Sequence, residues 1–318
     1  MGARVTGVPI MFEGYSLAEL GSIFAMQGFA GLILFSVFVL MALGLAIIFG
    51  QMGVINMAHG EFMILGAYVT YLCSTFISNY APALFPVYFF IAMALAFIAS
   101  GALGMLVEWG MIRFLYRRPL DTLLATWGLS LILQQVFRSV FGAREVGVVL
   151  PDWLMGSVAV TDTIEVPING LFVMALTMAI TIVIYAVMFR SRWGQGVRAV
   201  MQNRVMAGAV GINTEKVDRY TFGLGCGIAG VAGSAFTMIG STGPTSGQLY
   251  IVDTFLVVVF GGAQSLIGTI ASAFTISQAQ STMEFFLSGS TAKVLTLLTV
   301  VVILMLRPQG LFVLKVRR

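Results

Sequence analysis

The chain has 318 residues, of which 59% are hydrophobic and only 9% are charged. A water-soluble domain of this length could not expose so much apolar surface, so the composition excludes soluble proteins and predicts a polytopic membrane protein. The formal net charge is +4. Because the basic residues cluster between apolar runs, we expect them to hold loops at an anionic membrane surface and not to bind nucleic acid.

The apolar runs are predicted to be spanning helices, because a span needs about 20 apolar residues and its backbone amides must be satisfied within a helix or a closed barrel. Runs such as LFVMALTMAITIVIYAVMF lack the alternation of a barrel strand. No polar stretch could form a separate soluble domain, so we predict one all-α transmembrane domain over residues 1–318, with about 8 spanning segments. The runs lie at roughly 28–49, 53–78, 84–108, 119–141, 168–189, 220–241, 251–287 and 291–306.

Charged residues between the runs predict the orientation, because basic residues are enriched in cytoplasmic loops. The loop at about 142–167 is mainly acidic, so we expect it outside. We expect the basic clusters, and with them the C-terminus, to face the cytoplasm. These clusters are Arg113, Arg117 and Arg118; then Arg190, Arg192, Arg198, Arg204, Lys216 and Arg219; and finally Arg307, Lys315, Arg317 and Arg318.

The run at 251–287 is predicted to begin and end on the outer side, because the next run has to return the basic C-terminus to the cytoplasm. Its length is marginal for two full spans, so we predict a broken or re-entrant hairpin near 260–268, which contains Gln264. Asp253 and Glu284 bracket this hairpin. They are expected near the outer interface, where water reaches them.

A second interruption is predicted near 50–60. The stretches AIIFGQMGVINMAHGEFMILGAY and VVVFGGAQSLIGTIASAF both run apolar residues into Phe-Gly, pass through a small polar turn and resume an apolar helix. Unwound backbone is tolerated in a membrane only where it lines a cavity or is buried in protein. Glycine-interrupted segments at corresponding places therefore point to a transport pathway.

Asn56, His59 and Glu61 follow the first interruption, and His59 is the only histidine of the chain. Charged groups within a membrane usually face a bundle interior or a wet cavity and mark a route or a relay. The alternative is a satisfied pair at the cytoplasmic end of two adjoining helices, which would stitch the turn together. The sequence leaves both interpretations open.

The stretch ATWGLSLILQQVF places Thr126, Ser130 and Gln134 on one helical face, because residues four apart stack on a helix. Gln135 follows directly. These side chains could line a polar path, or they could hydrogen-bond to a neighbouring helix. The two interpretations are equally well supported by the sequence.

The segment at about 190–218 is predicted to hold a short surface helix from Val197 to Ala209 between two glycines. One face of it is expected to carry Val197, Val200, Met201 and Val205. One interpretation is a helix in the lipid interface. The other is a docking helix for a cytoplasmic partner.

Sequence motifs for enzymes are absent. The chain has no G-x-x-x-x-G-K-[ST], no HExxH, no G-x-S-x-G and no Cys/His cluster, and Cys73 and Cys226 stand alone in apolar surroundings. We therefore predict a protein that is not an enzyme and has no catalytic residues or metal site. If transport is energised, a separate ATPase has to supply the energy.

Two stretches carry a resemblance to a known family over almost the whole chain. GLAIIFGQMGVINMAHGEFMILGAY at 44–68, and GVRAVMQNRVMAGAVGIN at 196–213 with the later VVVFGGAQSLIGTIASAF, resemble the permease subunits of bacterial ABC importers of the branched-chain amino acid type, the LivH/LivM group. Within that group, LLATWGLSLILQQ, VFGAREVGVVLPDWLMG and RPQGLF are similar to the urea permeases of the UrtB type.

The resemblance implies a subunit in the bacterial inner membrane that moves urea inward by alternating access. Its implied partners are a homologous second permease (UrtC-like), two cytoplasmic ATPase subunits that bind ATP and Mg²⁺, and a periplasmic substrate-binding protein. No cofactor is expected on this chain. The residues implied to couple it to the ATPase are Gly196, Arg198, Gln202, Asn203, Ala207 and Gly211.

Urea is a small neutral molecule with several N–H donors and one carbonyl, so a path for it needs amide, hydroxyl or carboxylate groups. Two alternatives stay open: a permease for branched-chain amino acids or short-chain amides, and a stand-alone urea or water channel. The candidate pathway residues are Asn56, His59, Glu61, Thr126, Ser130, Gln134, Gln135 and Gln264.

Overall fold

A computed structural model describes residues 17–116, 118–161, 164–262, 265–307 and 310 of the chain. The described part is mostly helical, as predicted. Its helices are α1 (Leu17–Met52), α2 (His59–Tyr80), α3 (Tyr88–Gly110), α4 (Pro119–Phe141), α5 (Ile168–Arg190), α6 (Arg192–Gln202), α7 (Arg204–Ala209), α8 (Thr214–Phe236), α9 (Ser246–Gly261), α10 (Leu266–Phe286) and α11 (Gly289–Leu306). Short 3₁₀ turns are η2 (Pro82–Val87), η3 (Ile112–Phe114) and η4 (Asp152–Leu154).

Six helical stretches of the described chain are long and apolar enough to cross a membrane. This confirms the predicted polytopic helical protein. The α9 helix is apolar but shorter than these stretches. The six are Glu19–Met52, His59–Tyr80, Pro82–Phe114, Pro119–Phe141, Ile168–Arg190 and Gly289–Leu306.

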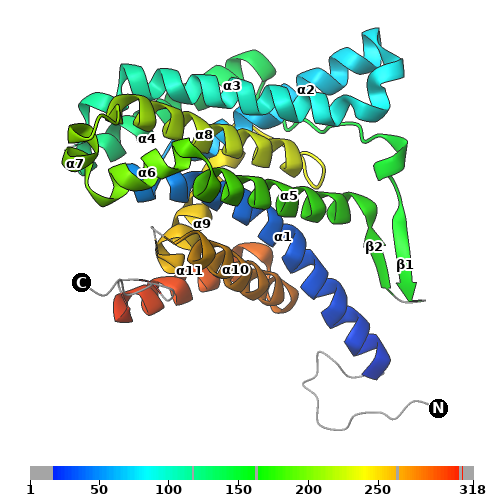
Figure 1. The fold of residues 1–318 in the computed structure, drawn as a ribbon. Coiled ribbons are helices and arrows are strands. Elements are labelled where there is room, and N and C mark those ends of the chain that lie inside the picture. Colours follow the sequence, from blue (N-terminus) through cyan, green and yellow to red (C-terminus); the bar gives the residue numbers. More distant parts are fainter. Residues whose placement is uncertain (1–16, 117, 162–163, 263–264, 308–309, 311–318) are drawn as a thin grey trace.

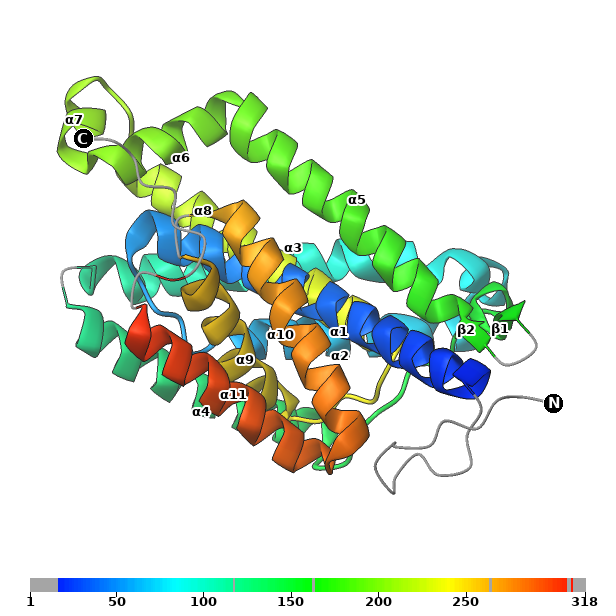
Figure 2. The same cartoon turned by 90° about the horizontal axis from the view of Figure 1, so that it is seen from below.

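The α8 helix lies at the centre of the bundle, where it packs against α1, α2 and α3 (Figure 1). From Thr221 to Phe236 nearly every α8 side chain is buried. The α6 and α7 helices lie at one end of the bundle, and the β1–β2 hairpin lies at the other (Figures 1 and 2). The α9, α10 and α11 helices pack on one another beside α1.

Glycines allow α2 and α8 to meet backbone to backbone. A Cβ atom added at Gly66 would clash with the carbonyl oxygen of Gly230, and one added at Gly233 would clash with the carbonyl oxygen of Met63. Small residues at helix crossings permit close packing within membranes, where a hydrophobic driving force between helices is lacking. The crossing therefore fixes the start of α2 against the central helix.

The segment at 142–167 is more ordered than the predicted loop. It contains a two-stranded antiparallel hairpin of β1 (Ser157–Thr161) and β2 (Ile164–Pro167), in which Ser157 pairs with Pro167. The β-branched residues of SVAVT and IEVP favour extended backbone, which explains the difference.

The predicted interruption of the run at 251–287 is confirmed. The α9 helix ends at Gly261, and α10 begins at Leu266, where the Ser265 hydroxyl accepts a hydrogen bond of 3.0 Å from the Gly268 amide. Gln264 lies outside the described residues. The side of the membrane on which each helix begins stays a prediction.

Candidate functional site

The first interruption lies between α1 and α2. The α1 helix ends at Met52, and Gly53 has a φ of 64°, a left-handed conformation that favours glycine. Residues 54–58 are not helical, and α2 begins at His59. The Asn56 side-chain oxygen accepts a hydrogen bond of 3.1 Å from the Ala58 amide, which orders the approach to α2.

His59 lies deep in the bundle. Its Nε2 atom is 3.1 Å from the carbonyl oxygen of Met41, eleven residues before the end of α1. At a rise of 1.5 Å per residue this corresponds to about 16 Å along the helix axis. Within the described chain no hydrogen bond joins His59 to Glu61. The geometry therefore differs from a satisfied His–Glu pair at the end of two helices.

Glu61 is only 1% exposed, and its hydrogen-bond donors come from α4. Its Oε1 atom accepts from Gln134 Nε2 at 2.8 Å and from Ser130 Oγ at 3.1 Å. Gln134 Nε2 also lies 3.1 Å from Ser130 Oγ. The second carboxyl oxygen, Oε2, has no hydrogen-bond partner in the described part of the chain.

The helical face predicted for Thr126, Ser130 and Gln134 is buried as a unit. Thr126 Oγ1 accepts a hydrogen bond of 3.1 Å from the Met57 amide in the interruption. The face therefore meets the interruption and the first turn of α2. Gln135 does not belong to it: its side chain is exposed on the other side of α4, beside Ile132, Val136, Ser139 and Val140.

Several buried polar atoms of residues 53–80, the interruption and α2, have no hydrogen-bond partner among the described residues. They are Asn56 Nδ2, His59 Nδ1, Glu61 Oε2 and Tyr68 Oη. Buried polar groups are almost always satisfied in folded proteins, so such a gathering marks a place that can receive hydrogen bonds from a bound molecule. Together with the α4 face, these residues form the candidate site, called the Glu61 cluster below.

Sequence reasoning missed Tyr68. Its ring is stacked on Phe141 of α4, with ring centroids 4.0 Å apart. A usable signal existed, because Tyr68 follows Glu61 by seven residues, or about two helical turns, and so shares its face. As for metals, no group of three or more His, Cys, Asp or Glu side chains that could hold an ion occurs in the described chain.

Two short helices, α6 and α7, replace the single helix predicted from Val197 to Ala209, so that prediction was wrong. The chain breaks at Asn203, whose φ of −156° and ψ of 103° are extended. Its side-chain oxygen accepts a hydrogen bond of 3.0 Å from the Met206 amide and so caps α7. Asparagine competes for backbone hydrogen bonds in this way, which explains the break.

The predicted apolar face of this segment is also divided. Val197 and Val200 of α6 are buried, but Val205 of α7 is 80% exposed. Met206 and Val210 are exposed beside it. Three large apolar side chains therefore stand at the tip of α7, and only Val205 among them belongs to the predicted face.

The residues implied to couple the chain to an ATPase fall into two groups. Arg198 is bound within the chain, because its guanidinium donates to the Met188 carbonyl and stacks on the Phe189 ring at 5.2 Å. Gly196 is half-buried and Ala207 is buried. The accessible members are Gln202, Asn203 and Gly211, whose φ of 89° is left-handed.

Asp253 differs from its prediction. It was expected at a wet interface, but it is buried and forms an ion pair of 2.7 Å with Lys293 Nζ. A buried carboxylate needs a partner, and α11 supplies this one. Glu284 is exposed and accepts a hydrogen bond of 3.0 Å from Gln280.

Comparison with known proteins gives one family match. The family model described as the branched-chain amino acid transport system permease component matches residues 28–306. No solved structure matches the chain significantly.

Three curated relatives are similar over nearly their whole length. The high-affinity branched-chain amino acid transport system permease protein LivH of Salmonella typhimurium is 28% identical over 91% of this chain and 95% of its own. LivH of Escherichia coli K12 is also 28% identical, over 91% of this chain and 95% of its own. BraD of Pseudomonas aeruginosa, a permease protein of the same kind of system, is 26% identical over 88% of this chain and 93% of its own.

Proposed function

The chain belongs to the branched-chain amino acid transport permease family, and on this premise we propose that it is a pore-forming subunit of an ATP-driven importer for urea. It is a multi-pass membrane protein and a transport subunit, not itself an enzyme. A permease component implies ATPase and binding-protein partners. We further propose that the complex lies in the bacterial inner membrane and works by alternating access, with ATP and Mg²⁺ bound by the partners.

The observation that carries the choice of substrate is the Glu61 cluster. Glu61 Oε1 receives neutral donors from Ser130 and Gln134, and Oε2 has no donor among the residues that the structure describes. No cationic side chain contacts the carboxylate in the described chain. A neutral molecule rich in N–H groups, such as urea or a short amide, can donate to Oε2 without a counter-charge of its own.

A second candidate is a branched-chain amino acid, which is the substrate class in the printed names of LivH and BraD. One feature of the site favours it. The α2 helix begins at His59, and the positive end of a helix dipole can receive a substrate carboxylate. In that arrangement the substrate ammonium would pair with Glu61.

The tip of α7 supports the proposed coupling to an ATPase subunit. Val205, Met206 and Val210 are exposed there, and the polar side chains of Gln202 and Asn203 are exposed beside them. A small apolar tip with a polar rim has the composition of a protein interface. We propose that this tip docks on the ATPase subunit from the cytoplasmic side.

Uptake by proteoliposomes tests the function. Vesicles would hold the permease with its partner permease and ATPase subunits, and the loaded binding protein would be added outside. We expect ATP-dependent uptake of labelled urea and little uptake of labelled leucine. The reverse preference would favour the second candidate.

Two controls separate an importer from a channel. Vesicles without ATP, and vesicles that hold this chain alone, should take up neither solute above the rate of empty vesicles. Equal urea flux from this chain alone would overturn the proposal and identify a channel.

A further inference from the structure

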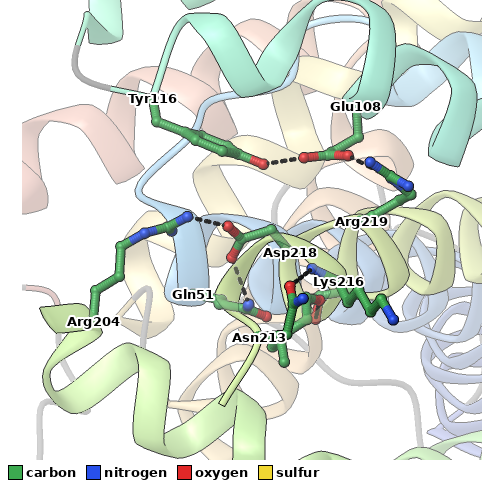
Figure 3. A network of polar contacts seen from close by, with 10 residues as sticks. Gln51, Glu108, Tyr116, Arg204, Asn213, Lys216, Asp218 and Arg219 are labelled. Carbon is green, nitrogen blue, oxygen red and sulfur yellow. Dashed lines mark hydrogen bonds and ion pairs between the residues drawn. The ribbon is translucent and has the colours of Figure 1, made fainter. Parts of the chain in front are cut away.

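Two buried carboxylates lie at the end of the bundle that carries α6 and α7 (Figure 3). Glu108 is near the end of α3, and Asp218 is in the second turn of α8. Asp218 is fully buried and Glu108 almost so. A buried carboxylate is costly unless it is paired, so the partners of these two groups show what each one holds together.

Asp218 joins three elements. Its Oδ2 atom accepts from the Arg204 guanidinium at the start of α7, and its Oδ1 atom accepts from Gln51 Nε2, in the last turn of α1, at 3.0 Å. Figure 3 shows Gln51 and Arg204 reaching this carboxylate from different elements. Asp218 therefore links α7 directly to the end of α1.

Glu108 holds a different set of elements. It accepts from Arg219 Nε of α8 at 3.3 Å and from the Tyr116 hydroxyl in the segment before α4. Burial, and then the bond to Glu108, raise the pKa of Tyr116 far above its usual range, so its phenol stays protonated and donates. The Arg204 guanidinium lies 5.2 Å from the centre of the Tyr116 ring. A partner of Asp218 therefore contacts a partner of Glu108, and the two sets of contacts are neighbours.

The position of Gln51 connects Asp218 to the candidate site. Gln51 stands two residues before Gly53, where the interruption begins, and the interruption leads into Glu61. The connection from α7 to the Glu61 cluster therefore consists of the contacts of Arg204 and Gln51 with Asp218, followed by a short stretch of backbone. Glu108 offers no such path, because neither of its partners lies on α1.

We propose that Asp218 is a positioning residue that makes α7 and the end of α1 move together. The inference rests on the proposed function, because it assigns the route by which the ATPase would act on the transport path. If α7 moved without α8 and α1, Asp218 would be left as a buried charge without its strongest donor, which is strongly unfavourable. A displacement of α7 is therefore passed to α1 and to the interruption.

The test measures solute uptake and ATP hydrolysis in the same proteoliposomes of the complete complex. The solute is whichever of urea and leucine the wild-type complex takes up. For Asp218→Asn and Arg204→Gln we expect hydrolysis within about twofold of wild type and uptake about tenfold lower, so that solute moved per ATP falls about tenfold. Arg204→Lys keeps the charge and should restore most of the wild-type ratio of solute moved to ATP hydrolysed, called the ratio below.

Glu108→Gln is the matched control. It changes a buried carboxylate with two donors at the same end of the bundle, but it leaves the link between α7 and α1 in place. We expect its uptake and hydrolysis to change together, with the ratio within about twofold of wild type. An equal loss of the ratio in Glu108→Gln would overturn the specific role of Asp218.

A milder variant keeps the test decisive if the Asp218 variants do not assemble. Gln51→Met removes only the donor on α1 and leaves the Arg204–Asp218 pair intact. It should assemble and lower the ratio about threefold, and an unchanged ratio would overturn the inference. If wild-type vesicles take up neither solute with ATP, the proposed function fails, and that result does not depend on any variant.

Discussion

Glu61 and Asp218 are both buried acids at helix starts, but their partners differ in kind. Asp218 is paired with the guanidinium of Arg204 and also accepts from Gln51. Among the described residues, Glu61 accepts only from the neutral groups of Ser130 and Gln134, and one of its oxygens has no donor there. A carboxylate with a fixed counter-charge can hold two helices together, whereas one with an oxygen that lacks a donor can accept hydrogen bonds from a solute.

Access to water explains how the chain builds the two environments. The Arg204 side chain is 42% exposed, so its guanidinium reaches Asp218 while part of it stays in water. Glu61 lies at the start of α2 against α4, and both of its donors are buried. A cation there would have to be desolvated completely, which is costly in a bundle interior.

The largest expected effect is a loss of folding stability when Asp218 loses its partner Arg204. Arg204→Ala leaves Asp218 buried without its guanidinium. Removing one partner of a fully buried pair costs roughly 3–5 kcal/mol, and because Arg204 is partly exposed we expect about 2 kcal/mol here. Thermal unfolding of the purified protein should show a melting temperature lower by roughly 4 °C. Arg192→Ala on the exposed side of α6 is the control and should melt within about 1 °C of wild type.

A smaller effect on stability is expected when Glu61 loses its donor Gln134. Gln134→Ala removes the shorter of the two hydrogen bonds to Glu61, so unfolding should be easier by about 1 kcal/mol and uptake should fall several-fold. Gln135→Ala is a closely matched control, because the same residue type stands one position along the helix with its side chain exposed. If both variants lose uptake equally, the Glu61 cluster is not the reason.

The smallest effect on the permease itself is expected at the tip of α7. Val205→Ser exposes a hydroxyl in place of an already exposed apolar group, so the melting temperature should stay within about 1 °C of wild type. Binding of the ATPase subunit should weaken by about tenfold, because an apolar contact is lost. Unchanged affinity in a binding measurement would contradict docking through this tip.

Features that depend on local spacing could be predicted from the sequence. The Thr126–Ser130–Gln134 face follows from helical periodicity, and the interruption near residue 53 follows from glycines between apolar runs. The break at Asn203 was also local, but a side-chain cap outweighed the helical pattern.

Features that depend on distant partners could not be predicted. Gln51 and Asp218 are 167 positions apart, and Asp253 meets Lys293 only because α9 and α11 pack side by side. Neither residue type nor spacing identifies such pairs in one sequence. The sequence indicated that Glu61 needed polar partners within the bundle. Its donors could be identified only from the packing of α2 on α4.

Uptake by the Glu61→Gln variant tests the central claim most directly. The amide is nearly isosteric and can still accept from Ser130, but it removes the charged acceptor offered to the solute. We predict that the reconstituted complex keeps its melting temperature within about 2 °C and its ATP hydrolysis within about twofold, while solute uptake falls at least tenfold. Wild-type uptake by this variant would contradict the account, because it would show that the solute does not use the Glu61 carboxylate.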